Sequence, residues 1–366
     1  MTSHKLEIIE NTDKKPKPEQ DQLPFGTTFT DHMFLMEYET GKGWHDPKII
    51  PYGPITLDPA AMIFHYGQTV FEGMKAYRTE SGQILLFRPD QNFLRLNLSS
   101  ERLSIPPIDE EQVLSYLSEL IDLERDWVPH TEGTSLYIRP FIIATDANLA
   151  VGPAQTYKFM IILSPVGSYF PGGLHPVIIS VEDKFTRAVK GGTGMAKTAG
   201  NYSSGYQAQA IAKKEGNADV LWLDGIEKKY IEEVGSMNIF FKINGEVLTP
   251  ELSGSILKGI TRMSIIELLN TWDIKVTERK ISIEEIYEAY EAGQVEEIFG
   301  TGTAAVISPI GELNWQGKKL IVNDHQIGEL SQKLYDTITG IQKGAIEDSM
   351  GWTVEVKETI NQHSKN

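Results

Sequence analysis

A glycine- and proline-rich segment near the middle of the chain constrains the fold more than any other feature. Residues 167–176 read GSYFPGGLHP, with three glycines and two prolines in ten residues. Such residues interrupt helices and strands. Strand-sized apolar runs precede the segment at 135–145 and 156–166. Because 366 residues exceed the size at which one hydrophobic core stops growing, we expect two domains joined by this segment.

Helical and strand patterns alternate on both sides of the segment, which predicts a mixed α/β (α+β) fold. Residues 108–128 show helical periodicity after a plausible N-cap, Asp109, and a helix over 201–216 should end at Gly216. Asn244–Gly245 lies between two apolar runs and indicates a type I′ hairpin. The predicted divisions are a mobile lead-in (1–24), a small N-terminal domain (25–166), a linker (167–176) and a large C-terminal domain (177–366).

Composition narrows the class of protein. The net charge of −16 disfavours a general surface for nucleic acid or anionic membrane, because phosphate binding needs clustered cations. The chain contains no cysteine, so disulfides, thiolate metal ligands and cysteine catalysis are excluded. The first twenty residues have no apolar core of a signal peptide, and no apolar run approaches the roughly 18 residues of a membrane span. We expect a cytoplasmic protein without a metal site.

One lysine stands in a glycine-rich stretch, GGTGMAKTAGNY, at 191–202. A Walker loop requires glycine directly before the lysine, whereas Ala196 precedes Lys197, and the glycines also miss the dinucleotide-binding spacing. A flexible surface loop with a solvated lysine remains open. So does a nucleophile, since burial beside apolar residues disfavours the ammonium form of lysine, and a neutral amine attacks carbonyls.

Other segments carry chemistry of their own. Strand alternation puts Glu232 and Glu233 on opposite faces, so we expect only one of them to point inward. The glycine turn that opens 254–269 enters a helix whose first amides could bind a phosphate, or could simply be capped by Thr261. The aromatic stretch 65–77, HYGQTVFEGMKAY, shows neither helical nor strand periodicity, so we expect a loop there.

Five segments occur in an order that resembles one enzyme family: FEGMKAY, LFRPDQN, SLYIRP, GGTGMAKTAGNY and EEVGSMN. The chain resembles the branched-chain aminotransferases, which are pyridoxal-phosphate enzymes of fold type IV. The resemblance implies a smaller N-terminal domain, a larger C-terminal domain and a cofactor in the cleft between them. It also implies a homodimer.

The resemblance implies a role for individual residues. Lys197 matches the lysine that forms a Schiff base with pyridoxal 5'-phosphate, and Glu233 matches the carboxylate that keeps the pyridine nitrogen protonated. Arg187 matches an arginine ten residues before the lysine. The implied cofactor residues are Arg95, Lys197, Tyr202, Glu233, Ser236, Ile260, Thr261 and Thr303, and the implied substrate residues are Tyr66, Phe71, Tyr137, Arg139, Tyr169, Thr303 and Ala304, with Tyr137 and Arg139 reaching the partner subunit's site.

The implied reaction transfers the amino group of L-leucine, L-isoleucine or L-valine to 2-oxoglutarate, giving a branched 2-oxo acid and L-glutamate. A D-amino-acid aminotransferase or an aminodeoxychorismate lyase would share Lys197 and Glu233. A non-catalytic protein that binds a phosphate ligand is the alternative from another class. Some family members carry a C-x-x-C pair after the G-T-A turn, but this chain has AAVIS at 304–308, so no thiol switch of that kind can operate.

Overall fold

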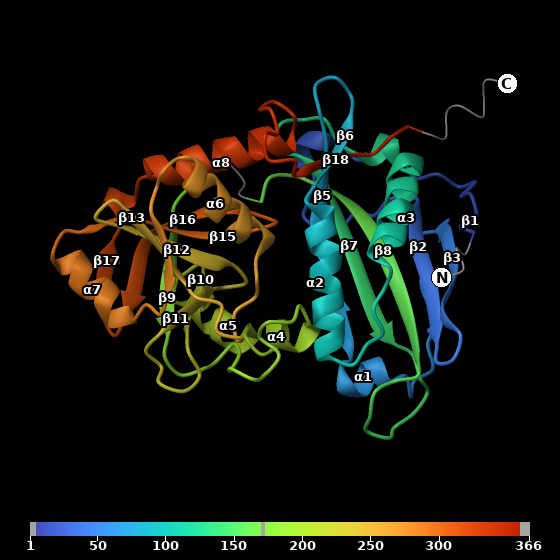
Figure 1. The fold of residues 1–366 in the computed structure, drawn as a ribbon, viewed down its shortest axis with the longest axis horizontal. Coiled ribbons are helices and arrows are strands. Elements are labelled where there is room, and N and C mark those ends of the chain that lie inside the picture. Colours follow the sequence, from blue (N-terminus) through green and yellow to red (C-terminus); the bar gives the residue numbers. More distant parts are fainter. Residues whose placement is uncertain (1–4, 170–172, 359–366) are drawn as a thin grey trace. The chain divides into compact units, whose positions relative to one another are not determined.

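The computed structural model describes residues 5–169 and 173–358, which form two compact units (Figure 1). Unit 1 holds the described residues of Met1–Ser168, Ala196–Ala199 and Gly340–Asn366. Unit 2 holds those of Tyr169–Met195 and Gly200–Thr339. Each unit contains a sheet with both parallel and antiparallel pairs together with helices, so the predicted mixed α/β class is confirmed. Over the described ranges, no helix is long and apolar enough to cross a membrane.

Unit 1 is built on a nine-stranded sheet of order β1-β3-β2-β8-β7-β5-β6-β18, with β4 paired to β7. The strands are β1 (Glu7–Ile8), β2 (His32–Glu39), β3 (Gly43–Pro51), β4 (Thr69–Phe71), β5 (Met74–Arg78), β6 (Ile84–Phe87), β7 (Ser135–Ala144), β8 (Thr156–Val166) and β18 (Thr353–Glu355). The helices of this unit are α1 (Met62–Tyr66), α2 (Pro89–Arg102) and α3 (Glu110–Leu123).

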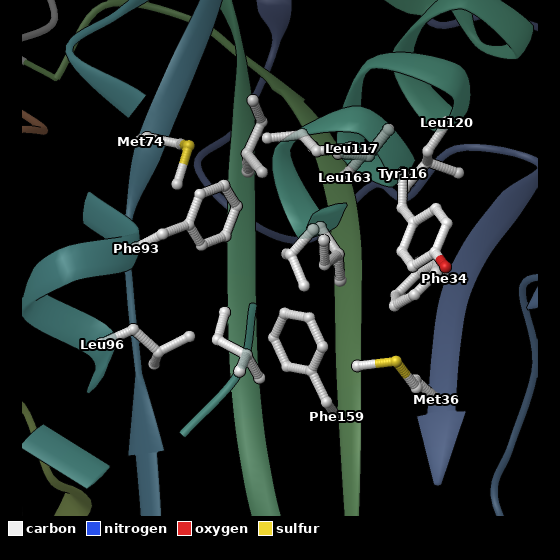
Figure 2. Close-up of a cluster of buried hydrophobic side chains, with 14 of the residues drawn as sticks. Phe34, Met36, Met74, Phe93, Leu96, Tyr116, Leu117, Leu120, Phe159 and Leu163 are labelled. Atoms are coloured by element: carbon white, nitrogen blue, oxygen red, sulfur yellow. The ribbon is translucent and has the colours of Figure 1, made fainter. Parts of the chain in front are cut away.

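The core of unit 1 lies between this sheet and helices α2 and α3. Alternate residues of β7 such as Leu136 and Ile138 are fully buried, as the two-residue period of a strand requires. Figure 2 shows Phe93 and Leu96 of α2 facing the same strands as the α3 side chains. Each such side chain contributes about 1.5–3 kcal/mol on burial. The other face of β7 is left half-buried and carries Tyr137, Arg139 and Phe141.

Unit 2 is built on a second nine-stranded sheet of order β11-β10-β9-β16-β15-β12-β13-β14, with β17 paired to β16. The strands are β9 (Val177–Glu182), β10 (Asp219–Leu223), β11 (Ile231–Val234), β12 (Asn238–Ile243), β13 (Glu246–Pro250), β14 (Val276–Arg279), β15 (Val295–Gly302), β16 (Val306–Trp315) and β17 (Lys318–Ile321). Its helices are α5 (Tyr206–Lys214), α6 (Ile260–Thr271) and α7 (Ile283–Glu291), while α4 (Ala199–Ser203) and α8 (Glu329–Gln342) include residues at which the chain passes between the units.

The local signals in the sequence fix several boundaries. The Asp109 side chain caps α3 by accepting a hydrogen bond from the amide of Gln112 at 3.0 Å. Gly216 follows α5 with φ 87°, the left-handed conformation of a helix-terminating glycine. Asn244 and Gly245 join β12 to β13 with φ of 49° and 76°, as a type I′ turn requires. These three predictions are confirmed, although the helix predicted over 201–216 is divided between α4 and α5.

Two predictions about local structure are wrong. The stretch 65–77 is not a loop, because it contains the end of α1, all of β4 and most of β5. Its short elements are held by pairing with β7, which sequence periodicity does not report. Glu232 and Glu233 do alternate on β11, but both are buried, with exposures of 5% and 2%, because all four residues of that strand are covered.

The division into units differs from the predicted domain boundaries in two segments. Thr198 forms a β-bridge with Val70, which attaches 196–199 to unit 1. β18 pairs with β6, so the end of the chain also belongs to unit 1 rather than to a domain running from 177 to 366. The predicted lead-in is partly ordered, because β1 pairs with β3. Residues 170–172 of the predicted linker lie outside the described residues.

Candidate active site

The backbone around Lys197 is fixed on three sides within unit 1. The Lys197 amide donates to the hydroxyl of Ser99 on α2 at 2.9 Å. The Lys197 carbonyl accepts from the amide of Phe71 at 3.0 Å, and the Thr198 hydroxyl donates to the carbonyl of Thr69 at 2.7 Å. Hydrogen bonds to α2 and to β4 therefore fix the backbone at Lys197, although the sequence alone was also compatible with a flexible surface loop.

The Lys197 side chain belongs to a row of cations and aromatic rings on the half-buried face of unit 1. Its Nζ lies 4.9 Å from the centroid of the Phe71 ring. The Arg139 guanidinium lies 4.8 Å from the same ring and 5.4 Å from that of Tyr137. Phe25 meets Tyr137 edge-on at 5.1 Å between centroids. Cation–π contacts orient these side chains. Four residues implied by the resemblance are therefore brought together: Lys197, Phe71, Tyr137 and Arg139.

A buried carboxylate that the sequence analysis did not single out lies next to this row. Glu72 has no exposed surface and receives the Nε and Nη2 hydrogens of Arg95 at 2.7 and 2.8 Å. Asn92 donates to the same carboxylate at 2.7 Å. Burial raises the pKa of Glu72, but the charge and hydrogen bonds of Arg95 and the charge of Lys197 outweigh it and hold that pKa below its usual value. Glu72 thus fixes Arg95 in one orientation.

The other substrate residues that the resemblance implies in unit 1 are held by hydrogen bonds and close contacts. Tyr66 ends α1 and is exposed, and its hydroxyl donates to the carbonyl of Leu149. The Tyr137 hydroxyl accepts a hydrogen bond from Arg139 at 3.1 Å. The same hydroxyl lies only 2.2 Å from the position that a Cβ atom on residue 73 would occupy, so a side chain there would collide with it. The Nε of Arg139 is buried without a hydrogen-bond partner among the described residues, which suits an anionic group at this face.

In unit 2, Glu233 on β11 is held by one hydrogen bond and one ion pair. Its Oε1 accepts from the backbone amide of Leu257 at 2.7 Å. Its Oε2 lies 3.2 Å from the Nε of Arg187 in an ion pair. Arg187 also donates to the carbonyl of Ser255. The carboxylate therefore ties the strand to the loop that leads into α6.

The loop that contains Ser255 and Leu257 leads directly into the N-terminus of α6. Gly259 is the N-cap and no side chain caps the helix, so Thr261 does not act as the cap. A Cβ on Gly259 would lie 2.0 Å from the Oδ1 of Asn238, which makes glycine necessary there. Ile260 and Thr261 are the first two helical residues, and the first amides of a helix lack partners within it. This arrangement suits a phosphate.

The other residues implied by the resemblance lie on short connections of unit 2. Tyr202 is half-buried in α4, and Ser236 is exposed on the turn after β11. Thr303 and Ala304 form the half-buried turn between β15 and β16. Tyr169 is the first residue of unit 2 and is half exposed, and burial raises the pKa of its hydroxyl.

Two features of the site escaped the sequence analysis. Glu72 was not recognised, although an acid between Phe71 and Gly73 in an otherwise apolar stretch is a signal of a buried ion pair. The contact of Ser255 with Arg187 joins residues 68 positions apart, and nothing local in the sequence indicates it.

Comparison with known proteins places the chain in a family. The family model described as "Amino-transferase class IV" matches residues 69–313. This chain belongs to the class IV aminotransferases, and it is accordingly a transaminase. It is 62% identical to branched-chain-amino-acid aminotransferase 2 of Bacillus subtilis (strain 168) over 97% of this chain and 98% of that protein.

Solved structures agree with the expected fold. The branched-chain amino acid aminotransferase of Escherichia coli aligns with a TM-score of 0.75 and 26% identity, over 89% of this chain and 99% of that one. The branched-chain aminotransferase of the archaeon Thermoproteus uzoniensis, solved with norvaline, has a TM-score of 0.74 at 25% identity over 89% of this chain and 100% of that one. The predicted fold type IV architecture is therefore confirmed.

Proposed function

We propose that this transaminase acts on branched-chain L-amino acids, transferring the amino group of leucine, isoleucine or valine to 2-oxoglutarate with pyridoxal 5'-phosphate as cofactor. The observation that carries the proposal is the position of Lys197, whose backbone is bound to α2 and β4 and whose amine lies over the Phe71 ring. A merely phosphate-binding protein does not need a nucleophile held in this way. The names of two relatives that are 62% and 61% identical to this chain favour this substrate class over D-amino acids or aminodeoxychorismate.

The residues present fit the cofactor. Glu233 is a buried carboxylate held by Arg187 and by the Leu257 amide, which suits it to hold a proton on the pyridine nitrogen. The N-terminus of α6 at Ile260 and Thr261 suits the phosphate, and so does Arg95, whose orientation Glu72 fixes. We include Tyr202, Ser236 and Thr303 in the cofactor site on the resemblance. When bound, pyridoxal phosphate supplies the electron sink for charge developing at the substrate Cα.

The chain's own residues then carry out defined tasks. With the cofactor bound, Lys197 would hold it through its Nζ. The same Nζ would take the proton from the substrate Cα as general base and return a proton as general acid. The Glu233 carboxylate would stabilise a proton on the pyridine nitrogen by facing it as a counter-charge. In the second half-reaction, 2-oxoglutarate accepts the amino group and leaves as glutamate.

The substrate pocket is proposed from aromatic residues and backbone donors. Phe71, Tyr66 and Tyr169 provide rings that suit an aliphatic side chain by apolar burial. The turn at Thr303 and Ala304 offers amides for the substrate carboxylate. Tyr137 and Arg139 are proposed to serve the partner subunit's site in a homodimer, and a cytoplasmic location completes the proposal.

The test is an assay of glutamate formed from 2-oxoglutarate with L-leucine, D-leucine or D-alanine as donor. Turnover with L-leucine, and none with either D-amino acid, is the expected result. Lys197→Ala should abolish turnover, since it removes the amine that moves the proton. Turnover with D-alanine but not with L-leucine would assign the chain to a D-amino-acid aminotransferase instead.

A further inference from the structure

Unit 2 contains a cavity that the proposed chemistry does not use. Its volume is about 420 Å³, and Glu232, rather than Glu233, is among its lining residues. Neighbouring residues of a strand point to opposite faces, so β11 presents one acid to the cavity and keeps the other for the Arg187 ion pair. None of the residues assigned above to cofactor or substrate is among the residues that line this cavity.

The inner end of the cavity is acidic and incompletely paired. Glu232 is 5% exposed, and its Oε1 accepts a hydrogen bond from the hydroxyl of Ser255. Its Oε2 is buried and has no hydrogen-bond partner among the described residues. Buried carboxylate oxygens are ordinarily paired, and burial here raises the pKa of Glu232. A cationic group in the cavity would supply the missing partner and offset that burial.

The other acid near the floor is already engaged. Both carboxylate oxygens of Asp224 accept backbone amides of the turn that follows it, over residues 226–230, at distances from 2.7 to 3.1 Å. Glu227 and Glu251 also line the cavity but are exposed, so Glu232 is the buried acid of this cavity with an unpaired carboxylate oxygen. Ser255 and Ser253, whose hydroxyls lie 3.0 Å apart, continue the polar floor.

The lining of the cavity also includes lysines and apolar side chains. Lys190 and Lys280 line the cavity and are both exposed, and the Lys280 amine lies 4.7 Å from the centroid of the Tyr230 ring. The walls include the buried side chains of Ile231 and Ile256. The cavity thus combines a buried carboxyl group, apolar side chains and an exposed rim of mixed charge, in which Lys190 and Lys280 stand with Glu227 and Glu251.

We propose that this cavity is a second binding site for a small apolar α-amino acid, taken as a zwitterion. The ligand's ammonium group binds Glu232 and the Ser255 hydroxyl, its carboxylate binds the rim lysines, and its aliphatic side chain packs on the isoleucines. The proposal rests only on residues of unit 2 and is independent of the proposed function.

The site has a physical connection to Glu233. Arg187 donates to the carbonyl of Ser255 at the cavity floor and forms the ion pair with Glu233 at 3.2 Å. A ligand that draws Ser255 toward itself therefore acts on the arginine that holds Glu233. This contact gives the second site a direct path to a residue of the candidate active site.

The test uses α-methyl-L-leucine, an apolar amino acid without a Cα hydrogen, so that it cannot be transaminated. Calorimetric titration of the purified protein should show saturable binding. Glu232→Gln should weaken it by about tenfold or more, because a charge-assisted hydrogen bond is replaced by a neutral one. The matched control is Glu227→Gln, an exposed acid at the same cavity, which should leave binding within about twofold.

A second variant, a folding control and a crystal soak distinguish binding in this cavity from binding elsewhere. Ser255→Ala removes the hydroxyl but keeps the carbonyl that Arg187 binds, and it should also weaken binding, while thermal melting checks that each variant is folded. A crystal soaked with the probe should show it against Glu232. Binding that Glu232→Gln and Ser255→Ala leave unchanged, or a probe found only at Lys197, would overturn the proposal. A protein that binds the probe in the cavity but fails the glutamate assay would overturn the proposed function instead.

Discussion

Glu72 shows how one buried carboxylate organises several residues of the candidate site. It pairs with Arg95 through two hydrogen bonds, accepts another from Asn92, and its pKa is lowered in part by the charge of Lys197. Removing one partner of a buried ion pair leaves a buried charge without a counter-charge. The resulting loss of stability is larger than the net stability that the intact pair provides. The role of Glu72 is therefore to position Arg95 rather than to contact the reacting atoms.

Glu72→Gln should lower the free energy of unfolding by about 3–5 kcal/mol at pH 7, because Arg95 loses its counter-charge inside the protein. The folded-state pKa of Glu72 lies below its usual value of 4.5. Its stabilisation is therefore complete above pH 4.5 and is lost as the pH falls toward the folded-state pKa. Urea titrations of both proteins between pH 7 and pH 3 should show the difference shrinking on the acid side. A difference that stays constant, or grows, in acid would contradict the assigned pairing.

At the scale of elements, the loop between β13 and α6 leads into the helix N-terminus that we propose binds the cofactor phosphate. Asn238 donates to the carbonyl of Leu257 at 2.9 Å, and Glu233 accepts the Leu257 amide. The start of α6 is thus set by residues on β11 and β12. Its close approach to Asn238 is possible only because residue 259 is glycine.

Gly259→Ala should weaken cofactor binding by about tenfold or more, since the new methyl group would displace Asn238 and with it the first amides of α6. The dissociation constant for pyridoxal phosphate, measured by fluorescence titration of the protein after cofactor removal, checks this. Gly53→Ala is the control, because a Cβ there meets nothing within 4 Å. Equal affinities for the two variants would show that the α6 N-terminus does not hold the phosphate.

The elements that follow from the sequence are those with a local cause. Asp109 and Gly216 mark helix ends through their own side chain or backbone, and Asn244–Gly245 adopts the left-handed backbone of a hairpin turn. The short strand β4 has no such signal and depends on β7. The same holds for the site, where motif residues could be named in advance but the burial of both Glu232 and Glu233 depends on what covers β11.

At the scale of the whole molecule, the chain returns to unit 1 twice after leaving it. The first return places Lys197 beside β4, and the second adds β18 to the edge of β6. Trp352 is 5% exposed and packs edge-on against Phe87 at 5.6 Å between ring centroids. The Trp352 carbonyl also accepts the amide of Arg88 at 2.7 Å. The last strand is therefore part of the structural support of unit 1.

Trp352→Ala should destabilise unit 1 by about 3–5 kcal/mol, the usual cost of removing a buried large aromatic side chain. Chemical denaturation followed by circular dichroism measures it. Val354→Ala on β18, the strand that follows Trp352, is the control, because that side chain is 36% exposed and should cost far less. Similar losses for both variants would mean that Trp352 does not anchor the C-terminal strand.

The central claim is that one lysine-bound cofactor serves both half-reactions on branched-chain substrates. Its most direct test is the visible absorption spectrum of the purified protein, reconstituted with pyridoxal phosphate, before and after addition of L-leucine and then 2-oxoglutarate. We expect a yellow protein that bleaches with L-leucine and regains its colour with 2-oxoglutarate. A yellow protein indifferent to L-leucine would contradict the substrate class, and a protein that stays colourless with pyridoxal phosphate would contradict the role of Lys197.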